Sequence, residues 1–438
     1  MQKRSHVRFR ILALIFLITT VNFADRATLS ITGPSMQAEF GFDMIRMGYL
    51  FSAFSWAYVF AQVPGGWLID RFGARRVYAA SIFGWSAFTL MQAGTGILGS
   101  PASAIAALFC LRFLVGMAEA PAFPANARVV ASWFPTRERG TASAIFNAAQ
   151  YFAAVVFTPL MAAVTHWYGW HWVYVLMGGL GMLLALAWLT AGRGPARHAG
   201  VNRAELDYLR AGGALVDLQE RPASRSDSTR PALRQLLTNR MLLGINIGQF
   251  SINVLTYFFL TWFPVYLVQQ RHMSILRAGF MVSLPALCGF FGGILGGVLS
   301  DSLLKRGCSL TVARKTPIVA GMLLSMSMIT CNYIDTDWII VCLMALSFFG
   351  KGLGALGWAV MADVAPKQAI GLAGSLFNSF GAVAGIVTPI AIGYILAASG
   401  SFDGALLFVG ANALVTIFAY LVIVQDIKRV EFRGFQHA

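Results

Sequence analysis

The chain has 438 residues, of which 57% are hydrophobic and 12% are charged, and its mean hydropathy is +0.67. Ordinary soluble domains are about a quarter charged, so this composition excludes them and indicates an integral membrane protein. The formal net charge is +15, which raises the question of where the basic residues lie.

Twelve apolar stretches follow one another along the chain, each long enough to cross a bilayer as a helix. They lie at about 9–31, 47–68, 77–96, 104–125, 141–164, 170–191, 242–268, 278–299, 316–334, 338–360, 371–397 and 403–424. Because a helix satisfies its backbone polar groups within one span, we predict an all-α membrane protein without a sheet. The first stretch follows the basic segment "MQKRSHVRFR" but ends without an A-x-A-like cleavage site, so we interpret it as a transmembrane helix rather than a secretory signal.

Basic residues gather at every second connection between the spans. They are Lys3, Arg4, Arg8 and Arg10, then Arg71, Arg75 and Arg76, then Arg137 and Arg139, then the arginines of 193–240, then Lys305, Arg306, Arg314 and Lys315, then Lys367, and finally Lys428, Arg429 and Arg433. The opposite loops hold little beyond Arg46, Arg271 and Arg277. The positive-inside rule therefore predicts that both termini are cytoplasmic. The charge reflects topology, and no nucleic-acid partner is expected.

The longest polar interruption, at 192–240, divides the spans six and six. We predict an N-terminal bundle at 1–191, a cytoplasmic linker at 192–240 and a C-terminal bundle at 241–438. Four residue pairs are each 231 positions apart, namely Asn22 and Asn253, Asp70 and Asp301, Pro135 and Pro366, and Asn147 and Asn378. A parallel repeat of six-helix halves is typical of a transporter that exposes a central site alternately to each side.

Other classes of function lack their motifs. The sequence holds no G-x-S-x-G elbow, no H-E-x-x-H pair and no phosphate loop, which argues against a membrane enzyme and a nucleotide-driven pump. An anion channel is disfavoured by the repeated halves. The five cysteines, Cys110, Cys288, Cys308, Cys331 and Cys342, have no metal-ligand spacing, and His166 and His171 lack two further ligands, so neither a metal nor a cofactor is expected.

The connection between the second and third spans carries a recognisable pattern, "GGWLIDRFGARR". Its Gly66, Asp70, Arg71, Gly73, Arg75 and Arg76 resemble the loop signature of the major facilitator superfamily, and "GGVLSDSLLKRG" resembles a degenerate second copy. The segments "NFADRATLSI", "RFLVGMAEAPAFP" and "FFGKGLGALGWAVMAD" are similar to the anion:cation symporter branch, nearest to its bacterial glucarate and galactarate transporters and more distantly to its galactonate transporters.

This resemblance implies a twelve-helix fold of two pseudo-symmetric bundles in the bacterial inner membrane. It further implies a functional monomer that takes up a sugar-acid anion by symport with protons. D-glucarate or galactarate is the expected substrate, and galactonate, a hexuronate and an aromatic acid are the alternatives. The proton is the coupling ion.

Five ionisable residues lie within the apolar stretches, namely Asp25, Arg26, Arg112, Glu119 and Lys351. A charge at the bilayer centre costs on the order of 2.5–3.5 kcal/mol on insertion scales, so such residues usually face the bundle interior. Arg112 and Glu119 are seven positions apart and share a helix face. We expect them to meet Asp25 and Arg26 in one cavity, where the charges cancel pairwise. A proton-coupled anion site is the hypothesis, and a purely structural ion pair is the alternative.

Roles for these residues follow from the resemblance alone. In the related symporters the acids matching Asp25 and Glu119 are proton sites, with Arg112 as their charge partner, and the base matching Arg26 binds a substrate carboxylate. The residues matching Tyr58, Gln150, Trp358 and Asn378 contact the polyol chain. Packing is the alternative role for the two aromatic residues, and interhelical hydrogen bonds are the alternative for the two amides. Many members have tyrosine where this chain has Phe23, so a hydroxyl contact is lost there.

Two further features have open interpretations. Lys351 either supplies a second cationic contact for a dicarboxylate or extends toward the outer surface. Asp70, Arg71, Arg75 and Arg76 are expected, on the resemblance, to form a latch that holds the halves closed on the cytoplasmic side. A solvated basic turn is the alternative.

Overall fold

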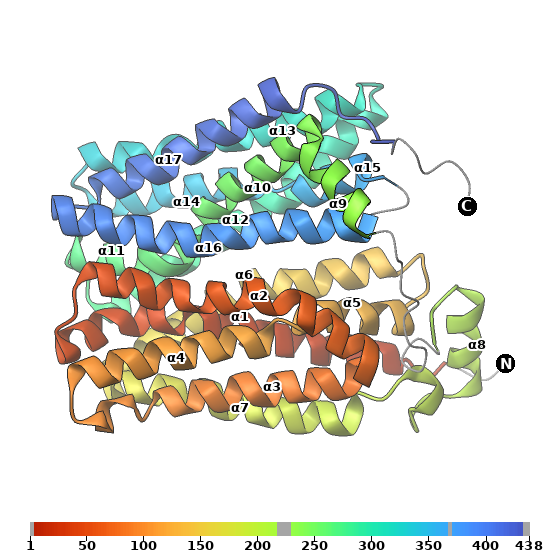
Figure 1. The fold of residues 1–438 in the computed structure, drawn as a ribbon, viewed down its shortest axis with the longest axis horizontal. Helices are drawn as coiled ribbons and strands as arrows, with labels where there is room; N and C mark the ends of the chain where they lie inside the picture. Colours follow the sequence, from red (N-terminus) through yellow and green to blue (C-terminus); the bar gives the residue numbers. More distant parts are fainter. Residues whose placement is uncertain (1–3, 217–228, 367–369, 432–438) are drawn as a thin grey trace. The chain divides into compact units, whose positions relative to one another are not determined.

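The computed structural model describes residues 4–216, 229–366 and 370–431, and every regular element in these ranges is helical (Figure 1). Lys3, Lys367, Arg433 and the part of the predicted linker at 217–228 lie outside the described residues, as does the side chain of Asp70. The chain divides into two units, Met1–Phe42 with Ala53–Ser224, and Asp43–Ser52 with Arg225–Ala438.

The first unit is built from eight of the helices that the structure describes. They are α1 (Val7–Phe40), most of α2 (Met44–Phe72), α3 (Ala74–Gln92), α4 (Pro101–Glu119), α5 (Ala122–Trp133), α6 (Arg139–Tyr168), α7 (Trp170–Ala191) and the short α8 (Arg203–Ala211). Helix α1 packs against α6 and α7, and α3 packs against α4 and α7.

The second unit repeats this packing with different helices. They are α9 (Thr229–Thr238), α10 (Arg240–Tyr257), α11 (Phe263–Gln269), α12 (Ile275–Lys305), α13 (Leu310–Ser325), α14 (Asp337–Leu353), α15 (Gly357–Val364), α16 (Ile370–Ser399) and α17 (Asp403–Phe418). Helix α10 packs against α16, and α13 packs against α14 and α17. These are the pairs that a shift of 231 positions produces from α1 with α6 and from α3 with α4 and α7, so the sequence repeat is a structural one.

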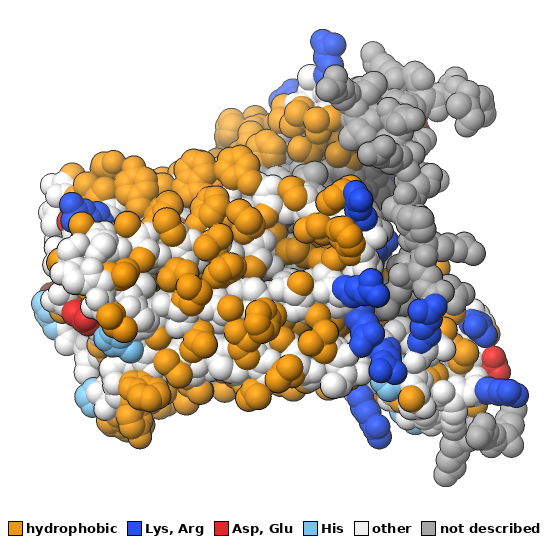
Figure 2. Space-filling view, turned by 60° about the horizontal axis from the view of Figure 1, so that its bottom comes forward, with side chains coloured by type: hydrophobic (Ala, Val, Ile, Leu, Met, Phe, Trp, Pro, Cys, Tyr) orange, Lys and Arg blue, Asp and Glu red, His pale blue; other side chains and the backbone are white. Residues whose placement is uncertain are grey.

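The surface of the helices is suited to lipid. Ten helical stretches among the described residues are long and apolar enough to span a membrane. Helices α2 and α3 are not among the ten. In α3, the polar residues Ser81, Ser86 and Thr89 are buried. Large apolar side chains such as Phe83 and Leu183 are exposed, as lipid-facing positions require. Figure 2 shows one such apolar face, with Lys and Arg gathered at its end.

Two spans predicted as single helices are interrupted. The span predicted at 104–125 contains a turn at Ala120 and Pro121 between α4 and α5. Proline has no backbone N–H and its ring clashes with the carbonyl four residues earlier, which stops α4. In the second unit, residues 354–356 separate α14 from α15, beginning three residues beyond the position equivalent to Ala120. Glu119 and Lys351 therefore lie in the last turns before the two breaks.

Glycines let neighbouring backbones approach closely. A Cβ atom on Gly116 of α4 would fall on the carbonyl oxygen of Phe54 in α2, and one on Gly292 of α12 would fall on that of Phe349 in α14. Small residues at such contacts are typical of membrane helix packing. The close approach at Gly116 places the backbone of α2 at Phe54 directly against α4.

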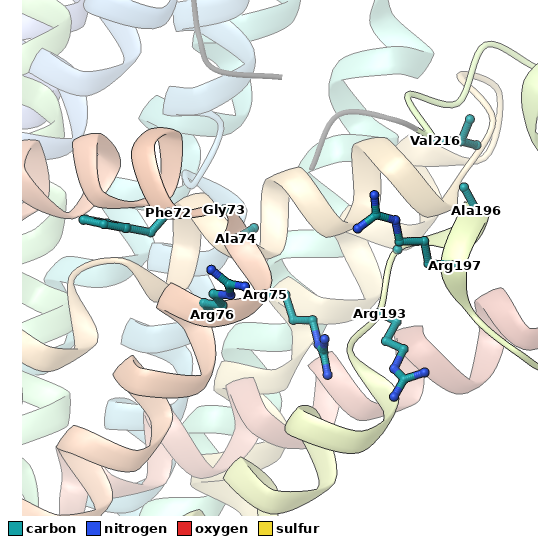
Figure 3. A pocket seen from close by; sticks show the side chains of 10 residues that line it. Phe72, Gly73, Ala74, Arg75, Arg76, Arg193, Ala196, Arg197 and Val216 are labelled. Carbon is teal, nitrogen blue, oxygen red and sulfur yellow. The ribbon is translucent and has the colours of Figure 1, made fainter. Parts of the chain in front are cut away.

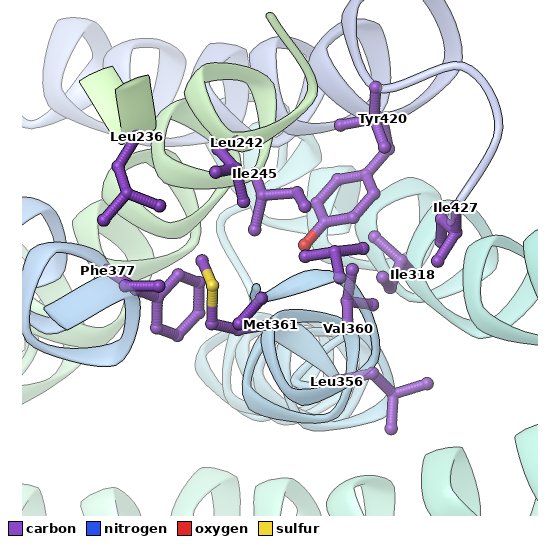
Figure 4. Close-up of a cluster of buried hydrophobic side chains, with 14 residues drawn as sticks. Leu236, Leu242, Ile245, Ile318, Leu356, Val360, Met361, Phe377, Tyr420 and Ile427 are labelled. Carbon is purple, nitrogen blue, oxygen red and sulfur yellow. The ribbon is translucent and has the colours of Figure 1, made fainter. Parts of the chain in front are cut away.

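The second unit also has a closed apolar core. Leu242 and Ile245 of α10 pack with Val360 of α15, Phe377 of α16 and Tyr420 beyond α17 (Figure 4). This core anchors the short helix α15, which begins at Gly357 beside the ring of Phe377. The position of Trp358 follows from this packing.

Candidate functional site

Four of the five predicted membrane charges come together in the first unit. Arg26 of α1 donates from Nε to Oε2 of Glu119 in α4 at 2.9 Å, and from Nη2 to Oδ1 of Asn22 at 3.2 Å. Glu119 is fully buried, and the Arg26 side chain is 11% exposed. An ion pair thus joins the middle of α1 to the last turn of α4.

Arg112 binds α1 in a way that the sequence did not predict. Its Nη1 donates to the main-chain oxygen of Asp25 at 3.2 Å and to Oγ1 of Thr28 at 3.4 Å, and its Nη2 donates to the main-chain oxygen of Arg26 at 3.0 Å. No ion pair joins Arg112 to a carboxylate in the part of the chain that the structure describes. Of the expected ion pairs between the four charged residues, the described structure contains one, between Arg26 and Glu119. Arg112 instead binds the main chain of α1 at Asp25 and Arg26.

Asp25, the residue before Arg26, contacts a different neighbouring helix, α3. Its Oδ2 accepts a hydrogen bond from Oγ1 of Thr89 in α3 at 2.7 Å, and its side chain is buried. Sequence reasoning missed Thr89, because nothing distinguishes one hydroxyl in an apolar span from another. The contact ties α1 to α3 through a carboxylate that has no cation directly on it.

Several polar atoms of the cluster have no partner. Within the described residues, Asp25 Oδ1, Arg112 Nε and Glu119 Oε1 are buried and make no hydrogen bond. Leaving such an atom unpaired costs on the order of 1–3 kcal/mol, so a cluster that served stability alone would satisfy them. Unpaired buried atoms at one place favour a site that exchanges partners.

Aromatic rings enclose the cation of the pair. The Cζ atom of Arg26 lies 4.9 Å from the ring centroid of Phe23, 4.8 Å from that of Phe54 and 5.0 Å from that of Tyr58. A guanidinium at this distance from a ring face is stabilised by the ring quadrupole. Phe23 lacks a tyrosine hydroxyl, but its ring still contributes to this surround. Phe54 was not singled out from the sequence, since aromatic residues are frequent in every span.

The remaining predicted contact residues lie apart from this cluster or in the second unit. Gln150 of α6 donates to the main-chain oxygen of Asn147 at 3.2 Å and is half-buried. Trp358 is 55% exposed on α15 with its ring 5.0 Å from that of Phe377, and Asn378 follows Phe377 on α16, half-buried.

Lys351 is buried rather than extended to the surface. It lies in the last turn of α14, its side chain is 8% exposed, and its Nζ lies 5.2 Å from the ring centroid of Phe348. No carboxylate among the described residues forms an ion pair with it. A buried ammonium without a counter-ion is costly, which marks the position as a candidate anion contact in the second unit.

Two residues of the predicted latch, Arg71 and Arg75, make different contacts. Arg71 lies over the rings of Trp67 and Phe72, with its Cζ 5.2 Å and 5.5 Å from their centroids. Arg75 donates to the main-chain oxygen of Leu189 in α7. Beside the second copy of the loop, Nη1 of Arg314 in α13 lies 3.8 Å from Oδ1 of Asp301, and its Nε lies 2.8 Å from Oδ2 of Asp363.

Comparison with known proteins agrees with this architecture. A family model of the Major Facilitator Superfamily matches residues 15–314. The chain belongs to this superfamily. It is therefore a multi-pass membrane transporter and not an enzyme, and the predicted all-α fold of twelve spans is confirmed.

Relatives and solved structures extend the comparison. The chain is 60% identical to the "Probable galactarate/D-glucarate transporter" of Bacillus subtilis, over 98% of this chain and 94% of that protein. It is 40% identical to the "D-galactonate transporter" of Escherichia coli O6:H1, over 97% of each. The crystal structure of a D-xylose-proton symporter superposes with a TM-score of 0.73 at 14% identity, covering 96% of this chain and 98% of that one, which shows the shared fold.

Proposed function

We propose that this transporter takes up the dianion of D-glucarate or galactarate together with protons, by alternating access across the bacterial inner membrane. The buried pair of Arg26 and Glu119 inside an aromatic surround carries the proposal. Relatives at 51–60% identity that are named as probable galactarate/D-glucarate transporters support the choice of substrate. Both termini are placed in the cytoplasm by the distribution of basic residues, and the monomer is the functional state.

The coupling works through competition for one guanidinium. In the observed arrangement the carboxylate of Glu119 holds Nε of Arg26. When Glu119 takes up a proton, its charge is lost and Arg26 becomes available to a substrate carboxylate, to which guanidinium donates in a two-point fork. The rings of Phe54 and Tyr58 keep the cation in place while its anion changes.

Asp25 is the second proton site. Its carboxylate is buried and is bound by Thr89 on one oxygen only, so the other oxygen can accept a proton without breaking a hydrogen bond. Arg112 holds the main chain at Asp25 and Arg26, which keeps both side chains at a fixed distance from α4. Two protons then balance the two charges of a sugar-acid dianion.

The second carboxylate of the substrate needs a second cation. Lys351 of the second unit is the candidate for this role, since it is buried in the last turn before the break in α14 and forms no ion pair with a described carboxylate. Tyr58, Gln150, Trp358 and Asn378 provide hydroxyl, amide and indole groups for the polyol chain. A monocarboxylate such as galactonate leaves the lysine without a partner, and we expect it to bind more weakly for that reason.

Uptake by purified protein in proteoliposomes tests this function. With a proton gradient directed into the vesicles, that is, with the outside more acidic, D-glucarate should accumulate. Unlabelled galactarate should compete fully with its uptake, and galactonate should compete at least tenfold less well. Uptake that saturates and is stimulated by substrate on the opposite side identifies a carrier. Transport of galactonate with no transport of glucarate would make the substrate assignment wrong, and downhill conductance without saturation would indicate a channel.

A further inference from the structure

A cavity of about 580 Å³ lies at the basic end of the first unit, away from the buried charge cluster. Its walls come from the turn between α2 and α3, from the segment that follows α7, and from Val216 beyond α8. Four of its ten lining residues are arginines, Arg75, Arg76, Arg193 and Arg197, and none is acidic. Figure 3 shows Arg75 and Arg76 at the start of α3 and Arg193 and Arg197 on the segment that follows α7.

Three of the four cavity arginines, Arg75, Arg76 and Arg193, have no carboxylate partner in the part of the chain that the structure describes. The Nε atom of Arg75 is buried and makes no hydrogen bond, although its Nη2 donates to Leu189. Guanidinium groups of like charge are held together here at an electrostatic cost that an anion would relieve.

The pKa of His198, which lies beside the cavity, is lowered by burial and also by the positive charge of Arg193. Arg10 adds to this lowering of the pKa, and Glu205 opposes it. Protonation of this ring is therefore disfavoured beside the cavity, as expected where positive charge is in excess.

The backbone adds to the attraction for an anion. Helix α3 begins at Gly73, whose φ of 83° suits only glycine and whose hydrogen side chain cannot cap the helix. Gly73, Ala74, Arg75 and Arg76 all line the cavity. The first N–H groups of a helix carry a partial positive charge and are a common binding place for phosphate.

We propose that this cavity binds a phosphate group, either as the headgroup of an anionic phospholipid or as a free phosphate anion. Guanidinium forks match phosphate oxygens in pairs, and several forks together can bind the two unesterified oxygens of a phospholipid phosphodiester or the four oxygens of a free phosphate. Trp67 and Phe72, both exposed at the end of α2 beneath Arg71, are the aromatic residues expected where lipid headgroups begin. A bound phosphate joins the α2–α3 turn to the segment after α7, and so fixes the first part of the linker on the bundle. The proposal does not depend on the identity of the transported substrate.

Binding measurements on the full-length protein in detergent test this site. The probes are dioctanoyl phosphatidylglycerol, dioctanoyl phosphatidylcholine and inorganic phosphate at low salt, read out by native mass spectrometry and by thermal unfolding. The variant R76Q/R193Q removes two exposed cavity arginines, and R203Q/R210Q removes two exposed arginines of α8 that do not line the cavity. Equal net charge in the two variants controls for general attraction.

We expect wild type and R203Q/R210Q to retain phosphatidylglycerol at least tenfold more strongly than phosphatidylcholine, and R76Q/R193Q to lose this preference. Competition by millimolar inorganic phosphate in wild type identifies the free anion as a ligand as well, whereas no competition identifies the lipid headgroup. If R76Q/R193Q and R203Q/R210Q lose the preference equally, or if wild type shows none, the site does not exist. Gel filtration of both variants and their unfolding temperature without probe establish that they fold.

Discussion

Arg26 is held by two kinds of contact that respond differently to a proton. The aromatic rings around it are unaffected by pH, whereas its ion pair with Glu119 disappears when that carboxylate is protonated. The guanidinium therefore stays at the same place but changes its availability. In the proposed symport, the aromatic rings hold Arg26 in place, and protonation of Glu119 decides whether Arg26 can bind the anion.

The variant Glu119→Gln tests this coupling at a single side chain. Glutamine has nearly the same shape but carries neither charge nor exchangeable proton, so Arg26 is permanently released. We expect accumulation driven by one pH unit to fall from roughly hundredfold to no more than equilibration, while exchange of internal for external substrate persists. Uptake and counterflow in the same proteoliposomes measure both quantities.

Glu39→Gln is the matched control, because Glu39 lies at the far end of α1, bound by Trp170 and exposed. It should accumulate substrate as wild type does. Full accumulation by Glu119→Gln would remove Glu119 from the coupling role.

The sequence predicted which residues of the cluster meet, but not how they bind. Asp25, Arg26, Arg112 and Glu119 are conspicuous because charges are rare in apolar spans, and helix geometry places two of them on one face. The contacts of Arg112 with main-chain oxygens depend on side-chain reach and on the depth of α4 against α1. The spacing of residues along the chain does not determine how far α4 is shifted along α1, and it does not single out Thr89 or Phe54.

At the scale of helices, the two breaks have different signals in the sequence. Pro121 marks the end of α4 by its missing N–H, whereas the break after α14 follows from Gly354 and its neighbours, in a span already rich in glycine. A hydropathy profile treats both spans as continuous, since the broken residues are themselves apolar. Shifted by 231 positions, the first break predicts a second one at 351–352, three residues before the break that the structure shows.

The linker contains an element that the sequence did not predict. Helix α8 places Glu205, which is fully buried, at the start of α1. Its carboxylate accepts from the backbone N–H of Val7 at 3.0 Å and of Arg8 at 3.3 Å, from Nη1 of Arg8 at 3.3 Å, and from the hydroxyl of Ser5. A remote carboxylate thus caps the first turn of α1 in place of a local capping residue.

This contact should weaken in acid. Burial alone would raise the pKa of Glu205, but the hydrogen bonds from Ser5, Val7 and Arg8 outweigh it and hold the pKa below its ordinary value of 4.5. A lowered native pKa means that the contact contributes fully above pH 4.5 and is lost as the pH falls below that value. The protection factors of the amides of 203–216, that is, their exchange rates corrected for the intrinsic effect of pH, should therefore be high at neutral pH and should fall below pH 4.5.

Glu205→Gln should show the faster exchange already at pH 7, with little further change in acid, because charge-assisted bonds worth about 1.5–3 kcal/mol are lost. Asp207→Asn, on the exposed side of the same helix, is the control and should behave as wild type. Unchanged protection in Glu205→Gln would show that the apolar contacts of Leu209 and Val216 hold α8 in place without the carboxylate.

The whole molecule distributes its charges unequally between two similar units. The charge cluster of the first unit holds two acids, Asp25 and Glu119, and two bases, Arg26 and Arg112, whereas the second unit holds one buried lysine without a carboxylate partner among the described residues. The fold could be predicted from hydropathy and the repeat, because both are properties of long segments. The division of roles could not, since the repeat relates helices whereas the charged residues differ between the copies: the position equivalent to Lys351 is Ala120.

The net charge moved per transport cycle follows from this inventory. A dianion that enters with two protons, one each on Asp25 and Glu119, carries no net charge and is insensitive to voltage. One pH unit is worth about 1.4 kcal/mol per proton, so two protons support roughly hundredfold accumulation. We expect D-glucarate uptake in proteoliposomes to follow the pH gradient and to be unchanged by a potassium diffusion potential imposed with valinomycin at equal pH. Electrical recording on supported membranes should show no steady transport current.

A third proton would make the cycle electrogenic, and 100 mV would then add about 2.3 kcal/mol, a roughly fiftyfold increase in accumulation. Such an increase would require a proton site beyond these two carboxylates.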